Sequence, residues 1–171
     1  MRNVGWNDCG RDSTMTIDPT RTCGSCTACC KALEVVELHK PPGRWCPHCS
    51  IGKGCKIYAE RPLSCREFRC EWLKGLGEEE DRPDRTKVIP DYIKLPEGLP
   101  GGVFQLWELT EGSLASSYVK RMTICALKGE VWVSHIPLHG RKRLFVPRSQ
   151  IITEEIASAL VRENITVADW P

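Results

Sequence analysis

Cysteines dominate the chemistry that this sequence can support. Nine of the eleven lie in one stretch of less than a third of the chain. They form a C-x2-C-x2-C-C run, then a C-x2-C pair, then three single cysteines: Cys23, Cys26, Cys29, Cys30, then Cys46 and Cys49, then Cys55, Cys65 and Cys70. Thiolates at two-residue spacings are a common signature of zinc or iron held by sulfur. The stretch therefore predicts a metal site.

The two remaining cysteines are not expected to be ligands. Cys9 lies alone in a polar amino-terminal segment, and Cys125 lies in the apolar run MTICAL, where it is expected to be a buried core thiol. An odd total of eleven also argues against a framework of disulfides, which would leave one thiol over.

Composition and the amino terminus favour a cytoplasmic protein without a membrane partner. The first residues lack the apolar region of a signal peptide, and no apolar run approaches the roughly 20 residues of a membrane-spanning helix. Thiols stay reduced in the cytoplasm, where clustered cysteines more often bind metal than each other. The net charge of +2 is too small to predict a nucleic-acid partner.

The first four cysteines are expected to lie on an amphipathic helix, or on a turn that becomes one, which runs from Cys23 to about Lys40 and stops at Pro41, Pro42 and Gly43. If the helix begins at Cys23, these four thiols would, at about 100° per residue, fall within an arc of about 120° and face one cluster. The adjacent Cys29 and Cys30 diverge by about 100°, so they would reach different metals, or different irons of one cluster.

The C-P-H-C sequence between Gly43 and Gly54 predicts a compact loop of the kind that presents paired thiols to a metal. His48 is either a nitrogen ligand or an exposed loop residue, and the second interpretation is favoured.

A second helix is expected from about Leu63 to Lys74, with Pro62 at its first position and with Phe68 and Trp72 toward a core. Cys65 and Cys70 would diverge by about 140° on such a helix, so they cannot face one site unless it ends or distorts.

Five cations lie among the later cysteines: Lys53, Lys56, Arg61, Arg66 and Arg69. They would either offset the negative charge of metal-bound thiolates or form an ordinary solvated face. Both interpretations stay open.

The sequence predicts an α+β protein with two lobes. Residues 1–21 are expected to be irregular, 22–76 to form a small irregular or helical cysteine-rich metal-binding lobe, and 86–163 to form a small α+β lobe, with the charged segment 75–85 as boundary. Strands are predicted at 87–93, 103–109, 131–136 and 144–146, and helices at 113–127 and 153–162.

Two strings of this sequence resemble one known family. The run CGSCTACC, followed by C-x5-C-K-I-Y-x2-R-P-x2-C-R-E-F from Cys49 to Phe68, is similar to the bacterial YkgJ-like cysteine-cluster family of zinc- or iron-chelating domains, over about residues 22–72. The resemblance implies metal chelation by Cys23, Cys26, Cys29, Cys30, Cys49, Cys55 and Cys65, with Cys70 matching a further cysteine of some members. We carry no family role onto Cys46 or His48.

The preferred function is therefore the chelation of zinc or iron, the latter as an ion or in an iron–sulfur cluster of the four-iron type. One alternative is an iron–sulfur enzyme or redox partner, because a related cysteine cluster occurs in flagellin lysine methylases. Another is a zinc module that contacts protein or nucleic acid through Arg61, Arg66, Arg69 and the HGRKR turn. No catalytic triad, phosphate loop or dinucleotide fingerprint is present in the sequence.

Overall fold

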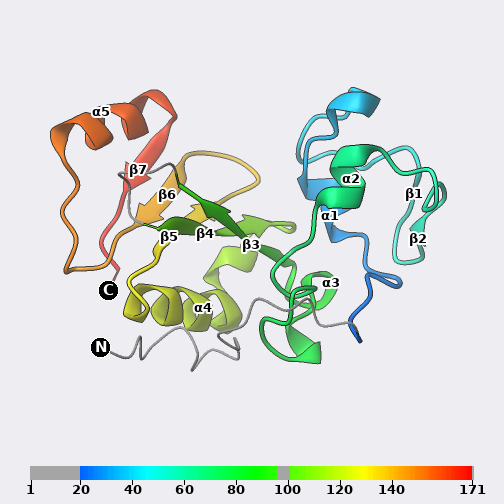
Figure 1. The fold of residues 1–171 in the computed structure, drawn as a ribbon, viewed down its shortest axis with the longest axis horizontal. Helices are drawn as coiled ribbons and strands as arrows, with labels where there is room; N and C mark the ends of the chain where they lie inside the picture. Colours follow the sequence, from blue (N-terminus) through cyan, green and yellow to red (C-terminus); the bar gives the residue numbers. More distant parts are fainter. Residues whose placement is uncertain (1–19, 96–100, 171) are drawn as a thin grey trace.

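A computed structural model describes residues 20–95 and 101–170 and confirms an α+β fold. A small cysteine-rich lobe lies beside a larger lobe built on a sheet (Figure 1). The predictions for Cys9 and for most of the irregular amino-terminal segment lie outside the described residues. Within the described residues, no helix has the length and apolar character needed to cross a membrane.

The larger lobe is organised on a five-stranded sheet in the order β3-β4-β5-β6-β7. Its strands are β3 (Val88–Lys94), β4 (Gly102–Glu108), β5 (Trp132–Ile136), β6 (Lys142–Phe145) and β7 (Ile165–Val167). The β4–β5 and β6–β7 pairs are parallel and the other two are antiparallel. The four predicted strands are confirmed, and β7 was not predicted.

Two helices connect the parallel strand pairs, since a parallel pair needs a crossover. They are α4 (Ser117–Lys128) and α5 (Glu154–Arg162), which confirm the two predicted helices. Each begins at a capping side chain: Ser116 accepts a hydrogen bond from the N–H of Val119, and Thr153 accepts one from the N–H of Ile156.

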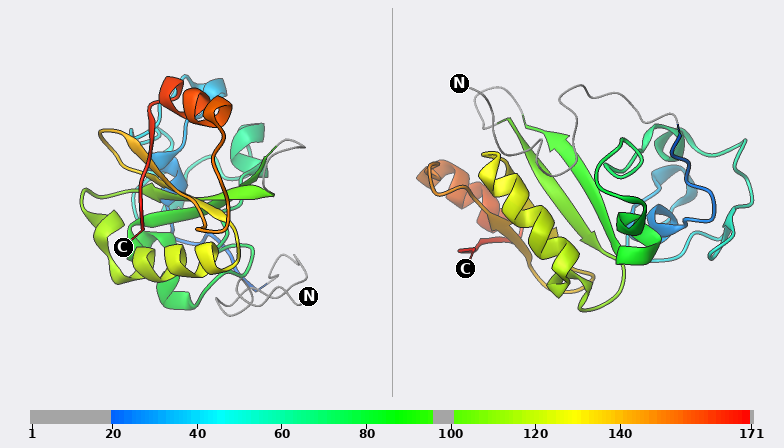
Figure 2. Two further views of the ribbon diagram at one scale, coloured as in Figure 1. Left: turned by 90° about the vertical axis from the view of Figure 1, so that its left-hand side faces the viewer. Right: turned by 90° about the horizontal axis from the view of Figure 1, so that it is seen from below.

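The two helices cover opposite faces of the sheet (Figure 2). Under α4, the main core joins strand residues such as Phe104 and Leu106 to Val119 and Met122, all at most 1% exposed. Under α5, a smaller cluster of Val103, Trp132 and Leu144 packs with Ile156 and Leu160. The sheet lobe thus has a core that contains no cysteine ligand candidate.

A continuous helix from Cys23 to Lys40 does not form, whereas the alternative prediction, a turn that becomes a helix, agrees with the start of this segment. Only α1 (Ala28–Ala32) and a short 3-10 helix (Val36–Leu38) form. Gly24 lies in the left-handed region at φ 48°, and Leu33 is extended at ψ 150°. Cys23 and Cys26 therefore lie in a turn that precedes α1, and the helical arc proposed for the four thiols does not exist.

The second predicted helix is also shorter than expected, since α2 (Leu63–Glu67) ends before Phe68, which is extended at ψ 125°. Pro62 precedes the helix as its N-cap residue instead of occupying its first turn. Phe68 is partly buried and Trp72 is 3% exposed, so both turn toward a core as predicted. Cys65 lies on α2, and Cys70 lies beyond its end.

The segment 75–85, which was predicted as the boundary between the lobes, contacts both of them, and Arg82 donates to the hydroxyl of Ser25 in the cysteine-rich lobe at 3.3 Å. The segment forms a 3-10 helix (Glu79–Asp81) and α3 (Pro83–Thr86), and Leu76 is buried in the main core. Arg21 also fixes its start: the guanidinium donates to the carbonyls of Trp72 and Leu76 at 2.8 and 3.0 Å. The lobes are therefore joined by structured chain.

Direct packing also holds the two lobes together. Ala28 and Ala32 of α1 form a buried cluster with Ile89 of β3 and with Leu109. The N–H of Glu71 donates to the carbonyl of Pro90 in β3 at 2.8 Å. Helix α1 consequently has one side against the sheet lobe and carries two adjacent cysteines at the centre of the cysteine-rich lobe.

Candidate thiol cavity

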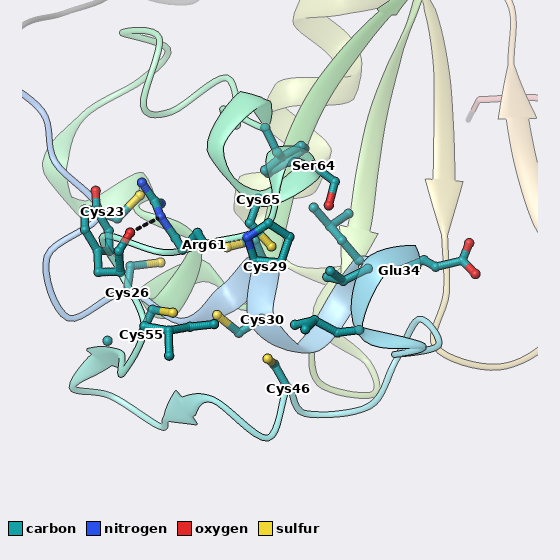
Figure 3. A pocket seen from close by; sticks show the side chains of 18 of the residues that line it. Cys23, Cys26, Cys29, Cys30, Glu34, Cys46, Cys55, Arg61, Ser64 and Cys65 are labelled. Atoms are coloured by element: carbon teal, nitrogen blue, oxygen red, sulfur yellow. Dashed lines mark hydrogen bonds between the residues drawn. The ribbon is translucent and has the colours of Figure 1, made fainter.

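Seven cysteines line one small cavity of about 70 Å³ in the cysteine-rich lobe. They come from the turn before α1, from α1, from the loop after Gly43, from the short strand β2 (Gly54–Cys55) and from α2, and they are Cys23, Cys26, Cys29, Cys30, Cys46, Cys55 and Cys65. Figure 3 shows these side chains arranged around the same space. The volume is several times the roughly 10–15 Å³ that one water requires, so the cavity has room for more than one atom.

Backbone hydrogen bonds connect the segments that carry these thiols. The N–H of Cys26 donates to the carbonyl of Cys23 at 2.7 Å, which closes the first turn. The N–H of Cys46 donates to the carbonyl of Cys30 at 3.0 Å, and the N–H of Cys49 donates to the carbonyl of Cys46 at 3.0 Å. The C-P-H-C loop is thus a compact turn, as predicted, and it is attached directly to α1.

A two-strand hairpin completes this side of the cavity. It pairs β1 (Cys49–Ser50) with β2 (Gly54–Cys55), and Cys49 lies opposite Cys55 in its register. Gly52 and Gly54 have φ values of 71° and 124°, which only glycine adopts without strain, and they let the chain reverse within a few residues. The short turn therefore brings Cys55 back to the cavity.

The rest of the cavity wall is mainly apolar, with one cation. Leu33, Ile57 and Phe68 contribute apolar surface. Arg61 also lines the cavity, and its guanidinium lies 3.6 Å from the ring centroid of Tyr58 while its Nε donates to the Tyr58 carbonyl at 2.9 Å (Figure 3). Arg61 is accordingly held in place as a positive charge beside the thiols.

The structure brings together six of the eight predicted metal ligands: Cys23, Cys26, Cys29, Cys30, Cys55 and Cys65. Cys49 does not line the cavity, although it lies opposite the cavity residue Cys55 in a two-strand hairpin. Cys70 packs with Cys26 and Cys29 against the cluster between the lobes. His48 is half-exposed and does not line the cavity.

Cys46 is the cavity residue that sequence reasoning left without a role. It is 9% exposed and lines the cavity, whereas its partner in the C-x2-C pair, Cys49, does not. The pair itself was the available signal, because two cysteines at this spacing usually act together. Which of the two cysteines lines the cavity depends on the direction in which the turn holds each side chain.

Burial favours the neutral form of several thiols in this lobe. It raises the pKa values of Cys23, Cys26 and Cys65 above the usual range, that of Cys49 to about 11 and that of Cys70 to about 12. The pKa of Cys30 is also raised, chiefly by a side-chain hydrogen bond with Cys29 and then by burial. A metal held here would have to displace these protons.

The thiols surround the cavity without converging on a single point. In the part of the chain that the structure describes, no group of three or more His, Cys, Asp or Glu side chains is arranged so that it could hold a metal ion. The nine cysteines from Cys23 to Cys70 are all free of disulfides. The donor atoms are thus available and neighbouring, and binding would require their side chains to move inward.

Cys125 differs from its prediction. It is half-buried on α4 and disulfide-bonded, not a buried core thiol. The core stripe of this helix is occupied by Val119, Met122 and Ala126, and Cys125 lies about 100° around the helix from Ala126. It is also separate from the thiol cavity, as expected.

The chain matches no family model, no curated protein and no solved structure. The resemblance to the YkgJ-like family stays a prediction.

Proposed function

We propose that this protein binds zinc or iron, the latter as an ion or an iron–sulfur cluster, through thiolates of its cysteine cavity. The observation that carries the proposal is the gathering of seven disulfide-free thiols around about 70 Å³ of space. Cysteine thiolates are the ligands that zinc and iron–sulfur clusters share. The YkgJ-like motifs, which cover the same segment, support the same class of function.

The proposed ligands are the seven cavity cysteines, with Cys46 added to the six that were predicted from sequence. One four-coordinate ion needs only four of them. Seven thiols around one cavity would suit two ions that share ligands, or a polynuclear cluster. The adjacent Cys29 and Cys30 fit this interpretation, because neighbouring side chains can reach different metals of one centre.

The surroundings of the thiols also support metal binding. The apolar wall formed by Leu33, Ile57 and Phe68 limits the access of water to the cavity. Arg61, which lines the same space, would offset part of the negative charge of bound thiolates. A metal would supply cross-links between short elements that have few apolar contacts of their own.

Elemental analysis and a visible spectrum of protein purified without oxygen test the proposal. Stoichiometric zinc in a colourless protein, or iron with acid-labile sulfide and broad visible absorption, supports it. Iron with sulfide would direct further work to the redox or enzyme alternative. Protein that contains neither metal and takes up neither Zn²⁺ nor Fe²⁺ after reduction of its thiols would refute it.

A further inference from the structure

Lys40 is a buried cation in the cysteine-rich lobe. The residue is 4% exposed, and its Nζ donates to the carbonyls of Lys31, at 3.1 Å, and of Leu33. The main chain of Lys40 is fixed as well, because it forms a β-bridge with Val35. The Val35 nitrogen lies 2.9 Å from the Lys40 carbonyl oxygen, and the Lys40 nitrogen lies 3.1 Å from that of Val35. The side chain is thus held at the carboxyl end of α1.

Among the residues that the structure describes, no carboxylate forms an ion pair with Lys40. An ammonium group removed from water is costly unless an opposite charge compensates it. The ammonium lies directly behind the wall of the thiol cavity, because Leu33, whose carbonyl it meets, and Val35, its bridge partner, both line that cavity. Burial lowers the pKa of Lys40, and negative charge on Cys46, Cys30, Cys29 or Cys65 would raise it. All four line the cavity.

We infer that Lys40 is the fixed counter-cation of the metal–thiolate centre and strengthens metal binding without touching the metal. The inference rests on the proposed function. Thiolates bound to a divalent ion leave the centre with excess negative charge, since four of them on Zn²⁺ give about −2. A buried ammonium at the carboxyl end of α1, the helix that carries Cys29 and Cys30, would stabilise that charge.

A purely structural role for Lys40 makes a different prediction. If its ammonium served only to satisfy the carbonyls of Lys31 and Leu33, its loss would weaken the metal-free and metal-bound proteins equally. If it compensates thiolate charge, its loss must act mainly on the metal-bound state. The quantity that separates the two roles is the increase in stability that bound metal provides.

The test compares three variants of the full chain with the wild type. Lys40→Met keeps the size of the side chain and removes its charge, and Lys40→Arg keeps the charge. Lys53→Met is the control that removes an exposed lysine of the same lobe. Zn²⁺ dissociation constants are measured by competition with a chelator, and melting temperatures with and without Zn²⁺. Lys40→Met should bind Zn²⁺ about 10- to 100-fold more weakly and gain less in melting temperature. Lys40→Arg and Lys53→Met should stay close to the wild type.

Two results would overturn the inference while leaving the proposed function intact. One is a Lys40→Met protein with the wild-type Zn²⁺ dissociation constant. The other is a Lys40→Met protein that fails to fold, together with a Lys40→Arg protein that keeps the charge but binds Zn²⁺ at least about tenfold more weakly than the wild type. A wild-type protein that binds no Zn²⁺ or iron would instead refute the proposed function, and the inference with it.

Discussion

The backbone N–H of Cys46 donates to the carbonyl oxygen of Cys30 at 3.0 Å. This bond attaches the C-P-H-C loop to α1 and sets the buried Cys46 beside the vicinal cysteines of the helix. Because both residues line the thiol cavity, the bond joins two segments that sequence spacing alone could not place together.

Replacement of Cys46 should lower the metal content of the protein. Cys46→Ala removes a cavity thiol, as do Cys26→Ala and Cys65→Ala, so each should bind less zinc or iron and lose metal-dependent stability. Cys70→Ala is the matched control, since Cys70 is partly buried but lies outside the cavity. Elemental analysis measures the result, and equal metal content in all four variants would show that the cavity thiols are not the ligands.

Packing between the lobes should contribute strongly to stability through Ile89. This side chain is 1% exposed on β3 and contacts the α1 cluster. Ile89→Ala should lower the free energy of unfolding by about 2–5 kcal/mol, because it removes buried methyl groups and leaves a cavity. Denaturant titration measures this change.

Ile93→Ala provides the control for Ile89, since Ile93 is on the same strand but 43% exposed. Its effect should be much smaller. Similar losses from both variants would mean that α1 does not rest on β3 as the structure has it.

Removal of metal should loosen the cysteine-rich lobe and leave the sheet lobe folded. The sheet has its own cores under α4 and α5, which contain no proposed ligand. After treatment with a chelator under reducing conditions, amide hydrogen exchange should accelerate in residues 22–74 and change little in β4 and β5. Uniform acceleration over both lobes would contradict this expectation.

The buried His135 should make the protein less stable in mild acid. It is 2% exposed, its Nε2 lies 2.8 Å from the hydroxyl of Thr123, and its Nδ1 has no partner within the described structure. Burial, with a smaller contribution from Arg143, lowers its pKa to about 4. At pH values between the pKa of His135 in the unfolded chain, near 6.5, and its pKa in the folded protein, the unfolded chain therefore binds a proton that the folded protein does not bind.

The free energy of unfolding is thus at its full value above about pH 6.5 as far as His135 is concerned. It falls by about 3 kcal/mol in total as the pH drops toward 4. Unfolding titrations across this range measure it, with His135→Gln as the comparison. The difference in stability between wild type and variant should shrink toward pH 4. A constant difference would mean that His135 does not titrate in this window.

The sheet lobe was largely predictable because its pattern is local. The β-branched and aromatic residues of β3 and β4, the capping residues Ser116 and Thr153, and the apolar stripe of α4 are each visible within a few neighbouring residues. Strand β7 was missed because three residues are too few to display an alternation, and it is a strand only by pairing with β6.

The cysteine-rich lobe was less predictable because long-range contacts override its local pattern. The prediction of a continuous helix from Cys23 to Lys40 failed at Gly24 and Leu33, where the backbone conformation departs from the apolar periodicity, and the alternative of a turn that becomes a helix was correct for the start of the segment. The gathering of thiols was nevertheless anticipated, since six predicted ligands share the cavity. In a close pair such as Cys46 and Cys49, the turn decides which thiol faces the cavity. The spacing of the two cysteines in the sequence does not determine that direction.

Trp107 lies at the packed junction between the lobes, where its fluorescence would respond to changes in that junction. Its ring packs against the same buried cluster as Cys29 and Cys70, on the sheet side of the thiols. Indole emission depends on the polarity and motion of its surroundings, so this tryptophan would report events in the neighbouring lobe through its fluorescence. Comparison with Trp107→Phe would isolate that signal, and the protein thus carries its own spectroscopic label for the filling of the cavity.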